Sequence, residues 1–369
     1  MKVLVLSPYP KEGASFRFRV LQYLPLLASQ GIDCSVRSFL TSWEFARVHL
    51  PGNYAVKALA LTSGTLRLGS ALAQAEDFDV ILVHRELHPL RLEIFERWLQ
   101  RVKKPVILDV DDAIYLPQPH GNRWLRRPRN PQTMARLAAI SRQVIVSNEY
   151  LGKWFRQHNS SVVVIPTVID TQRFVPRGFL KPPGPLTIGW IGSPSTAFYL
   201  EPLLPVFRQL AQEYHVAFKV VGAGHNFKDS GVPLVRESWQ LDMEVANFQS
   251  IDIGVYPLPN DPWALGKGGF KTIQYMAAGV PVVASPVGVN CEIIRDGENG
   301  FLASSEADWL MALRRLLSDA LLRQQVGQQG RRTVVERYSV AAHGERLIAC
   351  LREAAVRPSS SQPSMVMAG

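Results

Sequence analysis

The residues of this chain that are best suited to chemistry lie at 266–271, where two lysines stand among three glycines in the order Gly-Lys-Gly-Gly-Phe-Lys. At the start of a helix, unpaired backbone N–H groups and the positive end of the helix dipole favour an anion. Lys267 and Lys271 add two full charges, and Gly268 and Gly269 allow the backbone to approach a ligand closely. We interpret this segment as a diphosphate-binding site. The alternative is a tight loop with two solvated lysines.

A helix has to follow these glycines for such a binding site to form. Phe270, Ile273 and Met276 recur at helical spacing, and Gly279 stands where a glycine commonly ends a helix. A proline two residues later prevents the helix from continuing. The sequence therefore predicts a helix over about 270–278, followed by a short apolar strand.

Composition favours a globular protein of two domains. The chain has 369 residues, of which 47% are hydrophobic and 20% charged. Its apolar runs are too short to span a membrane, and the apolar part of the first ten residues is too short for a signal peptide, so we expect a cytoplasmic protein. Three widely spaced cysteines predict neither a disulfide framework nor a zinc site.

Short β-branched runs alternate with amphipathic stretches along the whole chain, which is typical of doubly wound parallel sheets. The predicted strands lie at 2–7, 80–84, 105–111, 143–148, 161–166, 186–192, 217–224, 251–257 and 280–285. A proline-rich stretch at 175–185 interrupts the alternation, so we predict two Rossmann-like α/β domains facing across a cleft, at 1–182 and 183–355. The last helix is able to pack back on the first domain, and 356–369 has the composition of a disordered tail.

Positive charge is concentrated in the first half of the chain. Residues 1–182 contain 25 Lys and Arg against 14 Asp and Glu, whereas the remainder is close to neutral. Between Asp112 and Glu149 there is no acidic residue, but six arginines occur at 123, 126, 127, 129, 136 and 142. Because nothing resembles a nucleic-acid-binding module, we expect this stretch to meet an anionic membrane surface or an anionic acceptor. A solvated basic loop is the alternative.

Five motifs occur in the order and spacing seen in one enzyme family. They read VIVSNEYL, VIPTVIDTQRF, DIGVYPL, MAAGVPVVAS and DGENGFL, at 144–151, 164–174, 252–258, 276–285 and 296–302. The chain resembles GT-B-fold glycosyltransferases of the retaining family 4 type, also called glycosyltransferase group 1, over roughly residues 1–340. The resemblance implies a nucleotide-sugar donor held by the second domain and a saccharide or lipid-linked acceptor held by the first. It implies no metal, no cofactor and retained anomeric configuration.

The chain departs from this family at charged positions. Two glutamates, eight residues apart in many members, correspond here to Gly266 and Gln274. The second glutamate commonly holds the nucleotide ribose, and Gln274 could still hydrogen-bond a hydroxyl. The usual Arg and Lys after the first strand of the second domain are also absent, since that turn begins Gly192-Ser193. Lys267 and Lys271 are then the nearest cations for the diphosphate.

The first domain supplies further candidates. The resemblance places Gly13 in a turn close to the donor phosphates, with Arg17 as the expected ligand and a solvated helix start as the alternative for Arg17 and Arg19. Asp109 and Asp111 share a face by strand alternation. Asp111 falls near a sugar-contacting histidine of the family, where a carboxylate could bind hydroxyls or take the acceptor proton; a structural, capping role is the alternative.

In the second domain, the nucleotide base is expected near 235–240 and Tyr256, where Trp239 could stack on it; ordinary packing is the alternative for Trp239. Gly192, Ser193 and Phe270 complete the expected donor contacts. We therefore predict a retaining, metal-independent hexosyltransferase in cell-surface polysaccharide or glycolipid synthesis, peripheral on the inner face of the membrane. Two other classes stay open. One is a nucleotide-sugar 2-epimerase, and the other is a non-catalytic sugar-binding scaffold, which the residues at Gly266 and Gln274 make credible.

Overall fold

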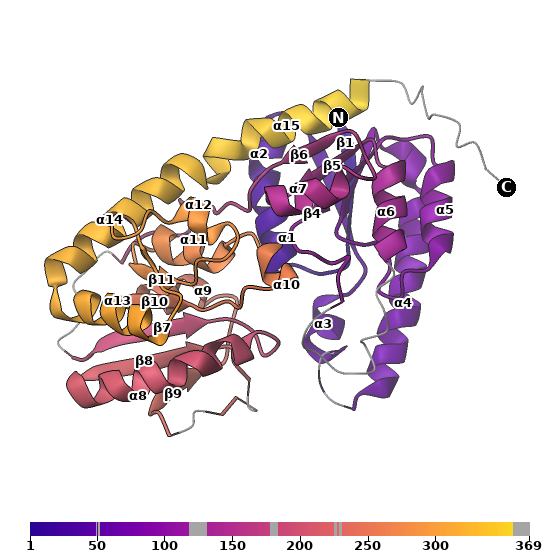
Figure 1. The fold of residues 1–369 in the computed structure, drawn as a ribbon. Coiled ribbons are helices and arrows are strands. Elements are labelled where there is room, and N and C mark those ends of the chain that lie inside the picture. Colours follow the sequence, from indigo (N-terminus) through magenta and orange to yellow (C-terminus); the bar gives the residue numbers. More distant parts are fainter. Residues whose placement is uncertain are drawn as a thin grey trace. The chain divides into compact units, whose positions relative to one another are not determined.

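The chain forms two compact units in the computed structural model, which describes residues 1–48, 50, 52–117, 131–177, 184–224, 227–228 and 231–356. Of these described residues, unit 1 comprises those within 1–115, 131–165 and 344–356, and unit 2 comprises 116–117 and those within 166–343. Figure 1 shows helices on both faces of the sheet in each unit.

Unit 1 is built on a six-stranded parallel sheet in the order β2-β1-β3-β4-β5-β6. The strands are β1 (Lys2–Ser7), β2 (Asp33–Ser38), β3 (Val80–His84), β4 (Val106–Val110), β5 (Gln143–Val146) and β6 (Val162–Val164). Every residue of β3, β4 and β5 is buried, as expected where helices cover both faces of a parallel sheet. The sequence did not predict β2, because this edge strand is polar and only half buried.

The helices of unit 1 are α1 (Ala14–Arg19), η1 (Leu21–Tyr23), α2 (Leu24–Ser29), α3 (Ser42–Val48), α4 (Tyr54–Ala73), η2 (Ala75–Asp77), α5 (Glu93–Arg101), α6 (Pro131–Ile140) and α7 (Glu149–Phe155). The last helix, α15 (Val340–Val356), belongs to unit 1 from Gly344 onward. Arg346 on α15 donates to the carbonyl of Val164, 2.9 Å away, which ties this last helix to the edge strand β6. The expected tail at 356–369 lies outside the described residues, apart from Val356 at the end of α15.

Unit 2 has a second six-stranded parallel sheet, in the order β12-β11-β10-β7-β8-β9. Its strands are β7 (Leu186–Ile191), β8 (Val216–Val221), β9 (Leu234–Glu237), β10 (Ile253–Tyr256), β11 (Val282–Ala284) and β12 (Phe301–Leu302), and its helices are η3 (Ala197–Leu203), α8 (Leu204–Glu213), α9 (Glu244–Gln249), α10 (Pro262–Leu265), α11 (Phe270–Ala277), α12 (Asn290–Ile293), α13 (Glu306–Ser318) and α14 (Ala320–Arg337). The prediction of two doubly wound α/β units is confirmed.

The predicted helix after the glycine-rich segment is present as α11, and Gly279 follows it with φ 69°, the left-handed conformation of a helix-ending glycine. In both sheets the strand order reverses beside the first strand, between β1 and β3 in unit 1 and between β7 and β10 in unit 2. Ligands of doubly wound proteins bind outside the carboxyl ends of the strands at such a switch point. The carboxyl ends of these strands are therefore where the site residues should be sought.

The units divide at Ile165 and Pro166, ahead of the expected boundary at 182/183. The segment after Pro166 bonds within unit 2, since the amide of Ile169 donates to the carbonyl of Tyr338 over 2.9 Å. Arg331 on α14 also donates to the carbonyl of Thr171, 2.7 Å away.

Candidate functional site

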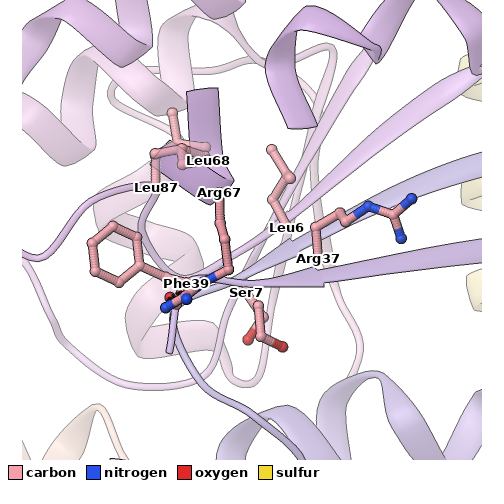
Figure 2. Close-up of a pocket in the computed structure, with 8 residues that line it drawn as sticks. Leu6, Ser7, Arg37, Phe39, Arg67, Leu68 and Leu87 are labelled. Carbon is pink, nitrogen blue, oxygen red and sulfur yellow. Dashed lines mark hydrogen bonds between the residues drawn. The ribbon is translucent and has the colours of Figure 1, made fainter. Parts of the chain in front are cut away.

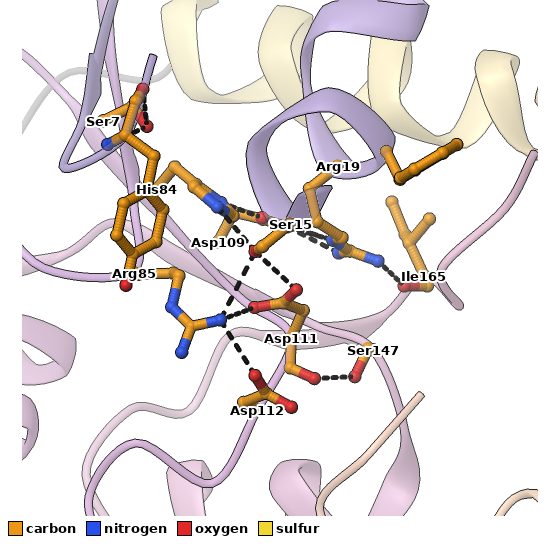
Figure 3. Close-up of polar contacts among 12 residues, drawn as sticks. Ser7, Ser15, Arg19, His84, Arg85, Asp109, Asp111, Asp112, Ser147 and Ile165 are labelled. Carbon is orange, nitrogen blue, oxygen red and sulfur yellow. Dashed lines mark hydrogen bonds and ion pairs between the residues drawn. The ribbon is translucent and has the colours of Figure 1, made fainter. Parts of the chain in front are cut away.

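A cluster of polar side chains occupies the switch point of unit 1. Ser15 lies in the first turn of α1, His84 is the last residue of β3, and Asp111 follows the end of β4. The hydroxyl of Ser15 donates to Oδ2 of Asp111 over 2.5 Å and lies 2.8 Å from Nε2 of His84, as Figure 3 shows. A carboxylate only accepts, so the hydroxyl proton of Ser15 points to Asp111 and the hydroxyl oxygen faces Nε2 of His84.

Asp109 holds the other side of the same histidine. Its Oδ2 lies 2.9 Å from Nδ1 of His84, and its Oδ1 accepts from Nη2 of Arg19 over 2.5 Å. Burial alone would raise the pKa of Asp109, but the charge of Arg19 and the hydrogen bond from His84 outweigh it and lower the pKa. Arg19 also donates to the carbonyl of Ile165. Asp109 is therefore an ionised carboxylate fixed inside unit 1.

Arg85 anchors the outer carboxylates of the cluster. Its Nη1 lies 2.8 Å from Oδ1 of Asp111 and 2.9 Å from Oδ2 of Asp112 (Figure 3). Although burial favours the neutral form, the charge of Asp111 raises the pKa of Arg85 well above its ordinary value. Its backbone has φ 67°, a strained conformation for a residue with a side chain. Such strain is concentrated at functional sites, and here it directs the guanidinium at the two carboxylates.

The other residues predicted in unit 1 lie in the turn between β1 and α1. A Cβ atom on Gly13 would stand 2.6 Å from Cβ of Tyr9, so the turn has no room for a side chain. Arg17 donates to the carbonyls of Glu12, at 2.9 Å, and Lys11, at 3.3 Å. Arg17 and Arg19 are both buried, so the alternative of a solvated helix start is wrong.

The three aspartates at the end of β4 and directly after it do not form a metal-binding group. Asp109 pairs with Arg19, and Asp111 and Asp112 pair with Arg85. Within the part of the chain that the structure describes, no cluster of three or more His, Cys, Asp or Glu side chains is placed to hold a metal ion.

In unit 2 the predicted diphosphate-binding site lies between α10 and α11. Gly269 precedes α11 with φ 64°, and a Cβ atom there would stand 2.5 Å from Cδ1 of Ile293. The hydroxyl of Tyr275, on α11, donates to the carbonyl of Gly189 over 3.0 Å and accepts from the amide of Ile191 over 3.1 Å. These contacts fix α11 against β7 and the glycine before it against α12, which is the rigidity that a preorganised site requires.

The polar side chains of α11 form a chain of contacts. Nζ of Lys271 donates to Oε1 of Gln274 over 2.8 Å and lies 5.4 Å from the ring centroid of Phe248. Nε2 of Gln274 in turn donates to Oε1 of Glu244, 3.5 Å away. Oε2 of Glu244 lies 3.2 Å from Nη2 of Arg173. Gln274 thus holds the ammonium of Lys271 and is itself fully buried.

The remaining donor candidates lie near neighbouring strand ends. Gly192 and Ser193 follow β7, and a Cβ atom on Gly222, after β8, would stand 2.4 Å from the carbonyl of Gly192 and 3.3 Å from Cβ of Trp239. The structure therefore brings Gly192 and Trp239 to one place. Tyr256, at the end of β10, packs instead against an apolar cluster of Tyr199, Leu258, Ala264 and Val287. Lys267, Gly268 and Phe270 are half-buried in the entrance to α11.

Several polar residues of these sites escaped sequence reasoning. His84 carried a signal, because it ends a predicted strand and polar groups at the carboxyl ends of parallel strands are candidate ligands. No sequence signal marked Ser15 or Arg85, since each is an ordinary residue of a turn or helix start. No sequence signal marked Glu244 or Arg173 either, because these residues meet only when α9 and the segment after Pro166 pack together.

Unit 1 also contains a small pocket. None of the site residues predicted from the sequence lines it. It is lined by Leu6, Ser7, Arg37, Ser38, Phe39, Arg67, Leu68 and Leu87, at the carboxyl ends of β1 and β2 (Figure 2). Arg67 donates to the carbonyl of Phe39 and to Glu44, both over 2.5 Å, so its guanidinium braces the wall. We therefore attribute this pocket to the packing of the loop after β2.

Comparison with known proteins gives a family match within the second half of the chain and a structural match to the whole fold. Residues 185–319 match the family model of glycosyl transferases group 1. The structure is similar to sucrose-phosphate synthase from Thermosynechococcus elongatus, with a TM-score of 0.71 and 14% identity over 96% of this chain and 99% of that chain. It is also similar to HepE from Anabaena in complex with UDP and glucose, with a TM-score of 0.69 and 14% identity over 95% and 99% of the two chains. The fold is therefore GT-B.

A curated relative is alpha-1,3/1,6-mannosyltransferase ALG2 from Rhizomucor pusillus, which is 33% identical over 86 residues. The match covers 23% of this chain and 19% of that protein, so the chain spans about a fifth of the relative's length. Separately, none of the helices described for this chain is long and apolar enough to cross a membrane.

Proposed function

We propose that the protein is a retaining glycosyltransferase that moves a hexosyl group from a nucleotide sugar to a hydroxyl acceptor. The observation that carries the proposal is the match of residues 185–319 to group 1 glycosyl transferases, because that segment contains the glycine-rich entrance to α11 and both lysines. Structural neighbours of this chain include HepE in complex with UDP-glucose, which supports a nucleotide sugar as the donor class.

The donor is assigned to unit 2. The amides at the start of α11 and the ammonium groups of Lys267 and Lys271 would neutralise the diphosphate, whose charge grows as the bond from the anomeric carbon to the phosphate oxygen breaks. Gly192 and Trp239 would flank the donor at the strand ends beside Gly222. No metal or cofactor is assigned a step.

The acceptor is assigned to unit 1. Asp111 accepts hydrogen bonds from Ser15 and Arg85, so its carboxylate is held in one orientation. Its side chain is still partly accessible, at 12%. It would orient the attacking hydroxyl while the new bond forms between that oxygen and the anomeric carbon. In the front-face mechanism that the family resemblance implies, the hydroxyl proton passes to the leaving phosphate oxygen.

The site of action is proposed to be the inner face of the membrane, through the basic stretch at 123–142. Arg123, Arg126, Arg127 and Arg129 lie outside the described residues. Arg136 does not contribute a free charge, because it pairs with Glu93 at 2.7 Å and with Glu96 at 3.5 Å. The lipid contact is therefore assigned to the four arginines before α6 and not to Arg136.

A donor screen tests the function. Calorimetry with UDP, GDP and uridine should show one nucleoside diphosphate binding more tightly than the nucleoside, and the matching nucleotide sugar should release that diphosphate only when acceptor is added. NMR of the product should show the anomeric configuration of the donor. A changed nucleotide sugar formed without acceptor would indicate an epimerase, and binding without turnover would indicate a scaffold; either result would contradict the proposal.

A further inference from the structure

Glu244 is a buried carboxylate with an unusual set of neighbours. It is the first residue of α9 and only 2% exposed. Its two oxygens face different partners, because Oε2 lies 3.2 Å from the guanidinium of Arg173 and Oε1 lies 3.5 Å from the amide nitrogen of Gln274. Burying a carboxylate is costly unless it is paired and hydrogen-bonded, so its retention here calls for an explanation.

The neighbours of Gln274 dictate how its amide is oriented. An ammonium group only donates and a carboxylate only accepts. Gln274 therefore turns its oxygen to Lys271, at 2.8 Å, and its nitrogen to Glu244. Each contact from Arg173 through Glu244 and Gln274 to Lys271 pairs a donor with an acceptor. A glutamate at position 274 would instead bring two buried carboxylates together, which accounts for glutamine where the family resemblance places a glutamate.

We propose that Glu244 is a positioning residue that acts through Gln274 to hold the ammonium of Lys271 at the entrance to α11. The negative charge that orients this region thus lies on α9 and not on α11. The ring of Phe248 lies 5.4 Å from Nζ of Lys271 and restricts the side chain, and the amide oxygen of Gln274 fixes its tip. Without Glu244, the amide of Gln274 is free to turn its nitrogen toward Lys271, and the cation loses its preorganised place.

The inference about ligand positioning rests on the proposed donor site, and a reciprocal exchange tests it. Glu244→Gln alone leaves two donors facing each other, either at Arg173 or at Gln274. Gln274→Glu alone leaves two acceptors facing each other. The double variant restores a donor and an acceptor at every contact. Its new amide at position 244 would accept from Arg173 and donate to the new carboxylate at position 274, which in turn accepts from Lys271.

Two readouts separate the possible outcomes. In urea unfolding of the protein without ligand, each single variant should lower the midpoint and the double variant should recover most of the loss, so that the changes are not additive. In calorimetry with UDP, each single variant should weaken binding by about tenfold and the double variant should return to within about twofold of the original Kd. Glu213→Gln, which breaks an exposed ion pair with Arg314, is the matched control and should change neither.

The pH dependence adds a signature of the like-charge pair. In Gln274→Glu the new carboxylate faces Glu244 and Lys271, with Arg173 on the other oxygen of Glu244, and the two carboxylates together hold a proton more tightly when folded. That variant should therefore lose more stability at pH 8 than at pH 5, whereas the double variant should not. Additive losses in the double variant would overturn the inference. Recovery of stability without recovery of UDP affinity would overturn the positioning role, and absence of UDP binding by the unmodified protein would overturn the proposed function itself.

Discussion

Asp109 and Asp111, two residues apart in the chain, are joined by hydrogen bonds that pass through His84 and Ser15. The inner carboxylate, Asp109, is buried against Arg19, whereas the outer one, Asp111, contacts Ser15 and Arg85 and keeps part of its surface accessible. Asp109 belongs to β4 and Asp111 follows it directly, and the packing around the two carboxylates gives them different tasks. The inner carboxylate should serve stability and the outer one activity.

Asp109→Asn should destabilise unit 1. The substitution leaves the buried guanidinium of Arg19 without its counter-charge, a loss of about 3–5 kcal/mol for a broken buried pair. Because the pKa of Asp109 is lowered in the folded protein, its contribution is present above the unfolded pKa and disappears as the pH falls through the folded pKa. Urea unfolding at pH 7 measures the loss. Asp33→Asn on the exposed edge strand β2 is the control, and an equal effect there would contradict the assignment.

Asp111→Asn should lower turnover with little change in donor affinity, and it should cost less unfolding free energy than Asp109→Asn because Arg85 keeps Asp112 as a counter-charge. The amide keeps the shape of the carboxylate but presents a donor on one side, so Arg85 or Ser15 loses an acceptor and the attacking hydroxyl is no longer oriented. A loss of about 100-fold in kcat is expected from the lost orientation. Single-turnover kinetics with saturating donor measures it. Turnover equal to that of the unmodified protein would exclude Asp111 from the acceptor site.

Lys271→Ala should lower turnover more than it lowers donor affinity. The ammonium is held by Gln274 at a fixed place, and removing one preorganised charge from a developing diphosphate costs about 2–4 kcal/mol of transition-state stabilisation. Lys271→Arg should restore only part, because a planar guanidinium does not replace a point charge. Lys267→Ala serves as the comparison and should cost less. If the effects of the two alanine variants were exchanged, Lys267 would hold the principal role.

Glu96→Gln should stabilise the protein at alkaline pH. Burial on α5 raises the pKa of Glu96 from 4.5 to about 7, against the opposing charge of Arg136. The folded protein therefore loses stability as the pH rises from the unfolded value through 7, and the amide should remove this loss, a gain of about 1–2 kcal/mol at pH 8. Thermal unfolding between pH 4 and pH 8 measures it. Glu93→Gln, which removes a half-exposed partner of the same arginine, should show no gain that grows with pH.

Replacing Arg126, Arg127 and Arg129 by Ser should weaken association with anionic liposomes by about 1 kcal/mol per charge, with donor binding unchanged. Arg136→Ser is the matched control, because that guanidinium is already neutralised by Glu93 and should contribute little. Sedimentation with vesicles of neutral and anionic composition measures association. Equal sedimentation of the triple variant and the unmodified protein would make the stretch a solvated basic loop.

The sequence alone determined most elements of the fold and the position of α11. Nearly continuous β-branched runs such as 80–84 form buried parallel strands because helices cover both faces. Gly279 and the following proline end α11 by a local backbone preference, which needs no knowledge of distant contacts. The strand β2 was missed because an edge strand that is polar and half exposed carries no such local pattern.

Only the tertiary structure decided which polar residues meet. Ser15 and His84 are 69 positions apart and come together because β1 and β3 are neighbours in the sheet, an order that local sequence does not encode. Gln274 and Glu244 are 30 positions apart and meet because α9 packs beside α11. Sequence reasoning located Lys271 from its glycines, but the amide that holds its ammonium, and the carboxylate behind that amide, depend on long-range packing that short-range periodicity cannot specify.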